Sequence, residues 1–372
     1  MLQLSIIDST NQHLYLTLFF MTIASFALIV CSILYFPAIR FFSRNKTIKK
    51  QKVTELPKIT IIIPTYNEEK NIAKKLNNTL SLDYPKEKIK IIVADGGSKD
   101  KTVDIARKFN VQVIKLKRRG KIVQINAGIR ASITRLVGIT DADVTLKRDA
   151  LKKAVSYLND KVVAVGGCFK IIKINTFYAK GKAEYHKQDW KIRYLESLLH
   201  APCSLDGKFT LFDKTKIKKI NPKAYTDDLE MTIQIIRRGY RCVIALDCQG
   251  YEPMHCSIWQ EINQMRRRIR LSIANAFQHL DMLFNLRYGY YSMFIFPFHR
   301  FINMFTPFFL FIISLFLILY YPMILILLLS LALLSILISP KLRYYSILVT
   351  ATILAWLDII TGNIKRGCKW DY

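Results

Sequence analysis

Acidic residues and paired cysteines are scarce in this sequence. Of its 372 residues, 27 are Asp or Glu and 56 are Lys or Arg, which gives a formal net charge of +29. The seven cysteines form no C-x-x-C pair, and the neighbouring residues Cys242, Cys248, His255 and Cys256 do not have the spacing of a structural zinc site. We therefore expect free and mostly buried thiols in a cytosolic domain.

Charged residues are absent from two long segments, residues 14–36 and 301–340. About 20 apolar residues are enough to cross the hydrocarbon core of a bilayer. The first segment therefore predicts one membrane helix, and the second predicts two that are joined at Tyr320, Tyr321 and Pro322. A cleaved secretory signal is a poor alternative for the first segment, because no basic residue precedes it and no small-residue cleavage site follows it.

Basic residues indicate how these helices are oriented. Six of them follow the first segment: Arg40, Arg44, Lys46, Lys49, Lys50 and Lys52. By the positive-inside rule they place the N-terminus outside and the middle of the chain in the cytoplasm of a multi-pass cell-membrane protein. Basic side chains near anionic lipid are stabilised by roughly 1 kcal/mol each. The positive charge therefore predicts a bilayer surface as partner and no nucleic acid.

The number of C-terminal spans stays open at two or three. Residues 344–360 form a further apolar segment, but it is short and contains Asp358. A third crossing would also place the basic tail at residues 365–369 outside, against the positive-inside rule. Either this segment is re-entrant, or residues 288–298 also enter the membrane.

Short apolar runs alternate with helical patterns over residues 53–255. The expected strands are residues 59–63, 89–94, 111–116, 136–140 and 162–166, and the expected helices are residues 67–81, 100–109, 121–134 and 150–158. This alternation predicts an α/β domain with a mostly parallel, Rossmann-like sheet. Ligands of such sheets bind beyond the carboxyl ends of the strands. Because polar motifs follow three of the expected strands, we expect one ligand crevice there.

Asp141 and Asp143 come directly after the expected strand at residues 136–140. Two carboxylates at a strand end can hold one Mg²⁺ or Mn²⁺ and leave other positions for phosphate oxygens. An incidental Asp pair in a turn is the alternative without function. The segment from Asp141 to Thr145 also fits the D-x-D-x-T pattern of haloacid-dehalogenase-type phosphatases. In those enzymes the motif ends the first strand of the core, whereas three expected strands precede it here.

A collinear series of motifs resembles the family 2 inverting glycosyltransferases. The series contains Pro64-Thr65-Tyr66-Asn67-Glu68-Glu69, the run VADGGSKD at residues 93–100, Gly120-Lys121, Asn126-Ala127-Gly128, Asp141-Ala142-Asp143 and Thr226-Asp227-Asp228. Residues 264–268 are similar to the Q-x-x-R-W element of the membrane-bound members, which include cellulose, chitin and hyaluronan synthases. The resemblance covers residues 59–270 and implies a GT-A fold, a nucleotide-sugar donor and a divalent cation.

The resemblance implies a role for each matching residue. The donor-binding residues would be Thr65, Tyr66, Glu68, Asp95, Lys121, Asp141 and Arg267. Asp141 and Asp143 would hold the metal, and Asp228 would be the catalytic base. Asp227, Gln264 and Arg268 would meet the acceptor or the pyrophosphate. Inverting transfer needs one base for the acceptor hydroxyl and one cation for the departing diphosphate, which agrees with this set.

Three positions depart from the family pattern. Gly96 replaces the second Asp of D-D-G-S, Asp227 replaces Glu, and Arg268 replaces the Trp that would offer a stacking face to the acceptor sugar. Without that Trp, single-sugar transfer and chain extension both stay open. Retention of configuration also stays open from the residues alone, since it needs only a second, nucleophilic carboxylate near the anomeric carbon.

Two of the matching segments have structural alternatives. The acidic pair at 227–228 could cap a helix over residues 229–237, because acidic residues stabilise a helix N-terminus. Apolar residues over 262–284 have helical spacing and predict an amphipathic helix at the membrane interface. On that helix, Arg266 and Arg270 suit contact with anionic lipid.

We therefore expect four segments along the chain. They are a membrane anchor with a basic linker (1–52), a GT-A catalytic domain (53–255), interface helices with the Q-x-x-R element (256–290) and a C-terminal membrane region (291–372). The predicted function is sugar transfer with inversion to a lipid-linked or glycan acceptor. Two other classes stay open: a haloacid-dehalogenase-type membrane phosphatase that uses Asp141 and Asp143, and a non-catalytic membrane protein that binds a nucleotide sugar.

Overall fold

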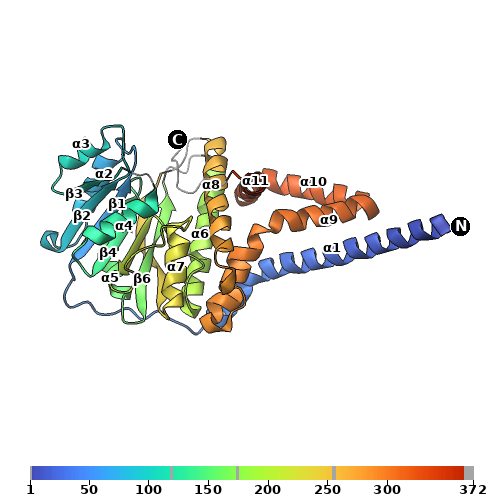
Figure 1. Ribbon diagram of the computed structural model, residues 1–372, viewed down its shortest axis with the longest axis horizontal. Helices are drawn as coiled ribbons and strands as arrows, with labels where there is room; N and C mark the ends of the chain where they lie inside the picture. Colours follow the sequence, from blue (N-terminus) through green and yellow to red (C-terminus); the bar gives the residue numbers. More distant parts are fainter. Residues whose placement is uncertain (1, 118–119, 173–175, 254–256, 364–372) are drawn as a thin grey trace.

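The structure is a computed structural model that describes residues 2–117, 120–172, 176–253 and 257–363. A sheet with its surrounding helices forms one end of the molecule, and apolar helices project from the other end (Figure 1). Helix α1 (Leu2–Ser43) leads away from the sheet, and the N-terminus lies at its far end. The predicted α/β fold with apolar helices on both sides of it in the sequence is confirmed.

One mixed sheet of eight strands forms the centre of the α/β domain. The strands are β1 (Ile59–Thr65), β2 (Ile89–Asp95), β3 (Gln112–Lys115), β4 (Leu136–Thr140), β5 (Thr145–Leu146), β6 (Val162–Ile171), β7 (Phe209–Asp213) and β8 (Arg241–Glu252). Their order across the sheet is β3-β2-β1-β4-β7-β6-β8-β5. The half β3-β2-β1-β4 is parallel throughout, and β6 is parallel to β8. The antiparallel exceptions are β7 and β5.

Burial on both faces explains the central strand. Every residue of β1 is buried, as a continuous β-branched run predicts for a strand covered on both sides. Helix α4 (Lys121–Ala131) packs on β1 through Gly128, where an added Cβ would lie 2.6 Å from the Ile62 side chain. The helix begins just beyond the carboxyl end of β3, so Lys121 lies at the edge of the sheet where ligands of this fold class bind.

Most predicted helices are present with shifted ends. The other helices of the domain are α2 (Ile72–Leu80), α3 (Thr102–Arg107), α5 (Ala150–Tyr157), α6 (Phe177–Leu199), α7 (Asp227–Arg237) and α8 (Ile258–Phe277). Helix α2 begins at Ile72 rather than at residue 67, because the preceding residues form a loop. Asn67 has a φ of 55°, and the amides of residues 67–69 donate to side chains of residues 98–102. The predicted helix over 262–284 ends at Phe277.

The chain beyond α8 consists of short turns and apolar helices. These helices are the π-helix η4 (Tyr291–Ile302), α9 (Thr306–Tyr320), α10 (Pro322–Ile338) and α11 (Pro340–Ile360). Tyr321 separates α9 from α10, so the predicted hairpin is confirmed. Among the described residues, Tyr15–Ser43 and Pro340–Ile360 are long and apolar enough to cross a membrane, and η4 with α9 forms a third such unit that is bent by 65°.

The cysteines agree with the expectation of free thiols. Cys168, Cys203, Cys242 and Cys248 are buried and free, and Cys31 on α1 is free and exposed. Two members of the discounted zinc pattern, His255 and Cys256, lie outside the described residues. No disulfide is found in the described part of the chain.

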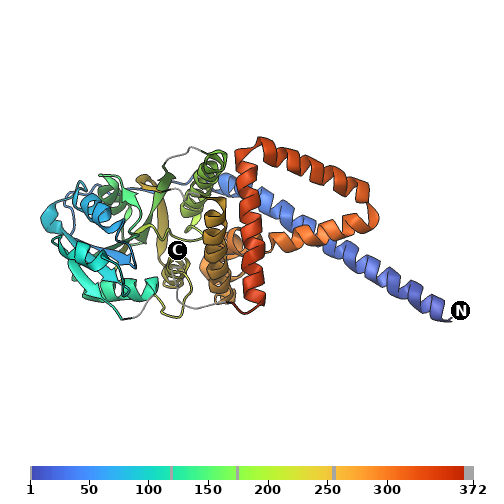
Figure 2. The ribbon, with the colours of Figure 1, turned by 90° about the horizontal axis from the view of Figure 1, so that it is seen from above.

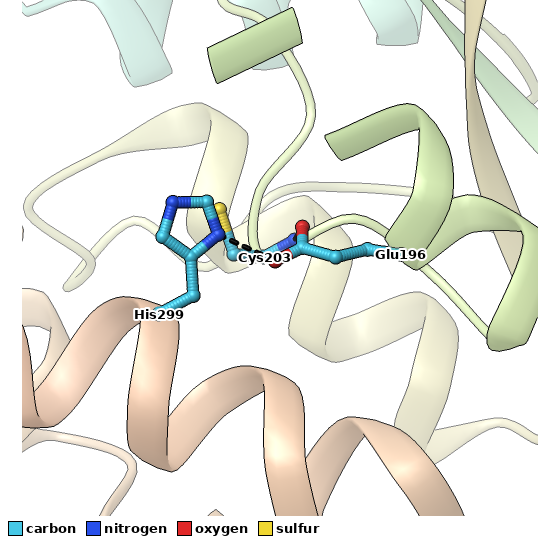
Figure 3. Close-up of side chains that lie close together, drawn as sticks. All are labelled: Glu196, Cys203 and His299. Carbon is cyan, nitrogen blue, oxygen red and sulfur yellow. Dashed lines mark hydrogen bonds and ion pairs between the residues drawn. The ribbon is translucent and has the colours of Figure 1, made fainter. Parts of the chain in front are cut away.

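A buried polar cluster joins the apolar helices to the α/β domain (Figure 3). Glu196 near the end of α6 is fully buried and accepts hydrogen bonds from the Tyr35 hydroxyl of α1 (2.6 Å) and the Cys203 backbone N–H (2.7 Å). His299 of η4 bonds to the same carboxylate through Nδ1. Ligand atoms of Glu196, Cys203 and His299 lie within 4.8 Å of one another, an arrangement that metal sites also show. Both oxygens of Glu196 already have partners, so the cluster is satisfied without an ion.

Replacing Glu196 with Gln should destabilise the protein by about 3 kcal/mol, because the change breaks a buried charged pair and leaves donors facing an amide N–H. Thermal unfolding of the purified chain in detergent measures this loss. Glu184→Gln is the matched control, since Glu184 is exposed on the same helix and should be nearly neutral when replaced. Equal melting temperatures of the two variants would contradict a joining role for Glu196.

Candidate active site

The loops after β1, β2 and β4 lie side by side because these strands are neighbours in the sheet. Thr65 at the end of β1 is in register with Asp95 at the end of β2, and β4 pairs with the other side of β1. Asp141 and Asp143 follow β4 directly. The structure thus brings together the strand ends that were predicted to converge.

Lys121 connects the loop after β4 to the start of α7. Its Nζ lies 2.8 Å from Asp141 Oδ1 and 3.2 Å from Asp227 Oδ2, and it donates to the Gly207 carbonyl at 3.0 Å. The Lys121 and Asp227 side chains are largely buried, with 15% and 16% of their surface exposed. The ammonium group of Lys121 therefore holds together two carboxylates from distant segments of the sequence.

The acidic pair lies in the first turn of α7 and not at its N-cap position. Helix α7 begins at Asp227, its N-cap residue is Thr226, and the Thr226 side chain makes no capping bond. Asp227 and Asp228 lie in the first turn, where negative charge stabilises the helix dipole. Burial raises the pKa of Asp227 to about 6, and the charges of Asp228 and Asp141 add to this rise while the neighbouring lysine opposes it. Asp228 Oδ1 also accepts from the Leu229 backbone N–H at 2.8 Å. The structural alternative therefore holds in part: the pair stabilises the start of α7 from its first turn, while Thr226 is the N-cap residue.

Two pockets open beside this bridge. The first is lined by Ile139, Asp206, Gly207, Thr210, Asp227, Asp228 and Met231. The second is lined by Asp141, Asp143, Val144, Lys182, Lys208, Glu252, Pro253, Gln264 and Arg268. Lys121 links the two through Asp141 and Asp227, and Lys208 links them again, because its Nζ lies 3.5 Å from Asp206 and 3.3 Å from Glu252. The base predicted at Asp228 and the metal ligands predicted at Asp141 and Asp143 line neighbouring pockets.

The second pocket has the donor set that a hard divalent cation needs. Burial raises the pKa of Asp143, and the nearby charge of Asp141 raises it further against the effect of Arg268. A bound divalent cation would relieve this repulsion, and carboxylate oxygens are the ligands that Mg²⁺ and Mn²⁺ prefer. Three acidic and three basic side chains line the pocket, so a divalent cation would leave it positive and suited to a diphosphate.

Helix α8 contributes Gln264 and Arg268 to the second pocket. Gln264 and Arg268 line it, one helical turn apart. Gln264 Oε1 is buried and has no hydrogen-bond partner in the described part of the protein, so it is available to accept a bond from a ligand hydroxyl. Arg268 is one of the described residues that line the second pocket, whereas Arg267 is not one of them. The predicted donor contact of Arg267 stays a prediction.

Asp95 is committed to its own loop. It is fully buried, and its Oδ2 accepts from the backbone N–H groups of Gly97 and Ser98, both at 2.9 Å, while the Ser98 hydroxyl donates to Oδ1. The Thr65 hydroxyl donates to the same oxygen at 3.4 Å. These bonds shape the loop after β2. The predicted contact of Asp95 with the nucleotide stays a prediction.

Glu68 lies on the D-x-D side of the crevice. It is 8% exposed and accepts from Asn71 Nδ2 at 2.8 Å. Burial raises its pKa to about 7, and the charges of Asp143 and Asp141 contribute to the rise. Tyr66, the other predicted donor residue of this loop, is 6% exposed. Both side chains thus come from the loop that borders the predicted metal ligands.

Lys75 is a buried charged residue that the sequence analysis missed. It lies on α2, is 1% exposed, and donates from Nζ to the Thr140 hydroxyl at 2.7 Å and the Val144 carbonyl at 3.1 Å. These two residues flank the D-x-D loop. Burial lowers the pKa of Lys75 to about 7, against the opposing effect of Asp141 and Asp143. A signal existed in the sequence, since Lys75 falls on the same helical face as the buried residues Ile72, Leu76 and Thr79.

Lys182, Lys208 and Glu252 were also missed. Lys182 lies on α6, Lys208 precedes β7, and Glu252 ends β8. The ion pair with Lys208 and the charges of Lys182 and Arg268 hold the pKa of Glu252 at about 2 despite its burial. No local motif marks these positions, and they reach the pocket only through the fold of the second half of the domain.

Arg266 and Arg270 do not have the predicted lipid contact as their main partner. Both guanidinium groups bind the carboxylate of Asp358 on α11. Asp358 is 3% exposed, so its charge requires these partners. Their contact with anionic lipid stays a prediction, and Asp358 is a partner that it did not foresee.

Residues 60–220 match glycosyl transferase family 2. The probable glycosyltransferase YdaM of Bacillus subtilis is 27% identical over 297 residues, which cover 69% of this chain and 67% of that protein. The poly-beta-1,6-N-acetyl-D-glucosamine synthase of Staphylococcus aureus is 30% identical over 255 residues, which cover 65% of this chain and 60% of that protein. The chain thus spans between 60% and 67% of the length of these curated relatives.

A solved structure shows the same fold. The mannosyltransferase PcManGT of Pyrobaculum calidifontis, solved in complex with GDP-Man and Mn²⁺, superposes with a TM-score of 0.78 at 22% identity. The match covers 93% of this chain and all of that one. The phosphatase alternative finds no support in these matches. Family match, relatives and fold agree: residues 60–220 form a family 2 glycosyltransferase domain, and the chain has the GT-A fold.

Proposed function

We propose that this protein transfers a sugar, with inversion, from a nucleotide diphosphate donor to a lipid-linked or glycan acceptor at the cytoplasmic face of the cell membrane. The observation that carries the proposal is the Lys121 bridge, which ties Asp141 at 2.8 Å and Asp227 at 3.2 Å. It sets the predicted metal ligands beside the acidic start of α7. A cation site and a base, the two parts that inverting transfer needs, would then lie beside the same bound donor.

Asp228 is the proposed base. It lines the first pocket and would take the proton from the acceptor hydroxyl as that oxygen attacks the anomeric carbon. Asp227 is less suited to this role, because Lys121 pairs with it. Direct attack by the acceptor, with no covalent intermediate on the neighbouring carboxylates of Asp206 and Asp227, would give the inversion that we propose.

The leaving diphosphate would lie in the second pocket. A divalent cation, Mg²⁺ or Mn²⁺, held by Asp141 and Asp143 would neutralise part of its charge. Lys182, Lys208 and Arg268 line the same pocket and add positive charge around the phosphate oxygens. Gln264 Oε1 would accept from a hydroxyl of the donor or acceptor sugar. The Mn²⁺ and GDP-Man of the mannosyltransferase structure support a metal-bound nucleotide sugar as the class of donor.

The membrane attachment rests on the apolar helices. α1 contributes a 29-residue stretch of high hydropathy, and only 6% of its most apolar window is buried inside the protein. The division into segments 1–52, 53–255, 256–290 and 291–372 is part of this proposal. The catalytic domain then faces the cytoplasm, where nucleotide sugars are available. The proposed reaction requires no nucleic acid as a partner.

Incubating the purified full chain with radiolabelled nucleotide sugars and Mn²⁺ or Mg²⁺ tests the proposal. We expect transfer of label to a lipid or glycan fraction, and loss of transfer when EDTA is added. Phosphate release without any transfer would instead support a phosphatase, and donor binding without turnover would support a non-catalytic protein. Either result would refute the proposed transfer.

A further inference from the structure

Helix α11 has the length and composition of a membrane span, yet two of its contacts are with charged residues of α8, through Tyr344 and Asp358. It has 21 residues, and among the described residues it is one of two helices that pass as a crossing by length and composition. Most of the buried side of α11 packs on apolar residues, among them Tyr178 of α6 and Ile262 and Met265 of α8. The two contacts with charged residues are the ones that a position inside hydrocarbon would disfavour.

The first polar contact is near the end of α11. Asp358 Oδ2 accepts from Arg266 Nε at 2.8 Å and from Arg270 Nη1 at 3.0 Å, and Asp358 Oδ1 pairs with the second guanidinium nitrogen of Arg266. Asp358 is 3% exposed, and the two arginine side chains are 35% and 19% exposed. Bidentate pairing of this kind is directional as well as strong. It fixes the end of α11 against α8.

The second polar contact is near the start of α11. The Tyr344 hydroxyl donates to Glu261 Oε1 at 2.8 Å, and the other oxygen of Glu261 pairs with Lys182 at 2.8 Å. Tyr344 and Glu261 are fully buried, and Lys182 is 2% exposed. Because Lys182 lines the second pocket, this contact runs from α11 to the site itself.

Backbone packing fixes the start of α11 as well. A Cβ added to Gly181 of α6 would lie 1.9 Å from the carbonyl oxygen of Pro340. Only glycine permits this approach of α6 to the first residue of α11. The hairpin of α9 and α10 therefore returns the chain to the side of the catalytic domain before α11 begins.

The two faces of α11 differ in the way that a surface helix requires. Its buried residues, Tyr344, Ile347, Ala351, Ala355 and Asp358, recur every three or four positions and face the domain. Leu342, Ile353, Leu357 and Ile360 lie on the other side and are 42%, 45%, 51% and 69% exposed. In Figures 1 and 2, α11 lies alongside α8 and runs across the base of α1, α9 and α10 rather than along them. One side of α11 is thus an apolar surface with no protein partner in the described chain.

We infer that α11 does not cross the membrane but lies along the cytoplasmic surface of the bilayer, clasped to α8 by Asp358 and Tyr344 and with its apolar side in the lipid. If α11 crossed, the adjoining α8 would be drawn into hydrocarbon together with Glu261, Arg266 and Arg270. Each charge at the centre of a bilayer costs roughly 2.5–3.5 kcal/mol on insertion scales. A position of α11 at the membrane surface avoids this free-energy cost. It also leaves the other face of α8 beside the aqueous second pocket.

This placement removes the conflict left by the charge pattern. The chain then leaves α11 on the same side as the catalytic domain. The basic tail at residues 365–369, which lies outside the described residues, follows on the cytoplasmic side as the positive-inside rule requires. The inference rests on the proposed membrane attachment but not on the sugar transfer, and carbonate-resistant pelleting of the full chain with membranes checks the attachment separately.

Cysteine labelling in sealed vesicles tests the inference. Two single-cysteine reporters are placed in a cysteine-free full chain: Ile133→Cys, which is 75% exposed on the catalytic domain, and Asn363→Cys, which is exposed directly after α11. An impermeant maleimide is applied to inside-out and to right-side-out vesicles. We expect both reporters to be labelled from the same face, the exposed face of inside-out vesicles. Labelling of the two reporters from opposite faces would overturn the inference.

A variant that lacks the Asp358 and Tyr344 contacts shows whether these contacts, rather than the hydropathy of α11, hold the helix at the membrane surface. In the double variant Asp358→Leu/Tyr344→Phe, Asn363→Cys should become labelled from the opposite face in part of the molecules. Thr350→Leu is the matched control, because it makes the exposed side of α11 more apolar and leaves both contacts intact. It should keep the wild-type pattern. Unchanged sidedness in the double variant would overturn the claim that these two contacts hold α11 at the surface.

Discussion

Asp228→Asn should lower the rate of sugar transfer by about 10²–10⁴-fold and leave donor binding nearly unchanged, because a positioned base contributes a factor of that size to the chemical step. The side chain lines the first pocket and is not part of the Lys121 bridge. Its amide keeps the shape of the carboxylate but cannot accept the proton. Steady-state transfer rates and equilibrium binding of the nucleotide sugar, measured on the same preparation, separate the two effects.

A control must account for the position of Asp228 in the first turn of a helix. Asp104 occupies the first turn of α3, where its side chain is exposed. Asp104→Asn removes a charge from a helix N-terminus and should cost only about 0.3–1 kcal/mol of stability, with transfer unchanged. If Asp228→Asn weakened donor binding as much as it slowed transfer, the assignment of Asp228 as the base would be wrong.

Asp143→Ala should abolish the dependence of donor binding on Mn²⁺ or Mg²⁺. We expect the affinity measured with Mn²⁺ to fall about 100-fold, equivalent to about 2.8 kcal/mol, to the level measured in EDTA. The reason is that Asp143 lines the second pocket with no ion pair to a lysine in the described part of the chain, whereas Asp141 is already bound to Lys121. Calorimetric titration of a nucleotide sugar with and without the metal measures the effect.

Asp149→Ala is the matched control for that experiment. Asp149 lies a few residues further along the chain, at the start of α5, and pairs only with Lys153 at the surface among its ion pairs in the described residues. Its replacement should leave metal-dependent binding unchanged, since surface pairs contribute little. Metal-dependent affinity that survives in Asp143→Ala would remove this residue from the metal site.

The parts of the site that are predictable from the sequence are those that follow strands. A buried strand such as β1 leaves a continuous apolar run, and the polar residues after it must then lie at its carboxyl end. The amino-acid pattern alone therefore predicts that Thr65, Asp95 and Asp141 are neighbours. The antiparallel insertion of β7 is not predictable in this way, because pairing direction depends on chain crossings that leave no local pattern.

The parts that were missed depend on contacts between distant segments. Lys75 reaches the D-x-D loop across 65 residues, and the partners Arg266 and Asp358 are 92 residues apart. Periodicity reports whether a position faces the core but not which partner it meets there. Arg266 was therefore assigned to lipid, although a buried acid elsewhere in the chain satisfies its charge. For the same reason the sequence left the course of the last apolar helix undecided.

The short helices α9 and α10 carry a consequence for the bilayer itself. With 15 and 17 residues they are about 22 and 25 Å long, whereas the 29-residue apolar part of α1 extends about 43 Å. A hydrocarbon core of about 30 Å is thicker than α10, and thicker than α9 unless η4 adds to it across their 65° bend, whereas it is thinner than the length of α1. On the proposed membrane attachment, the hairpin would be matched by thinner lipid around it, and α1 would be accommodated by tilting. Acyl-chain length would then affect the enzyme through its anchor.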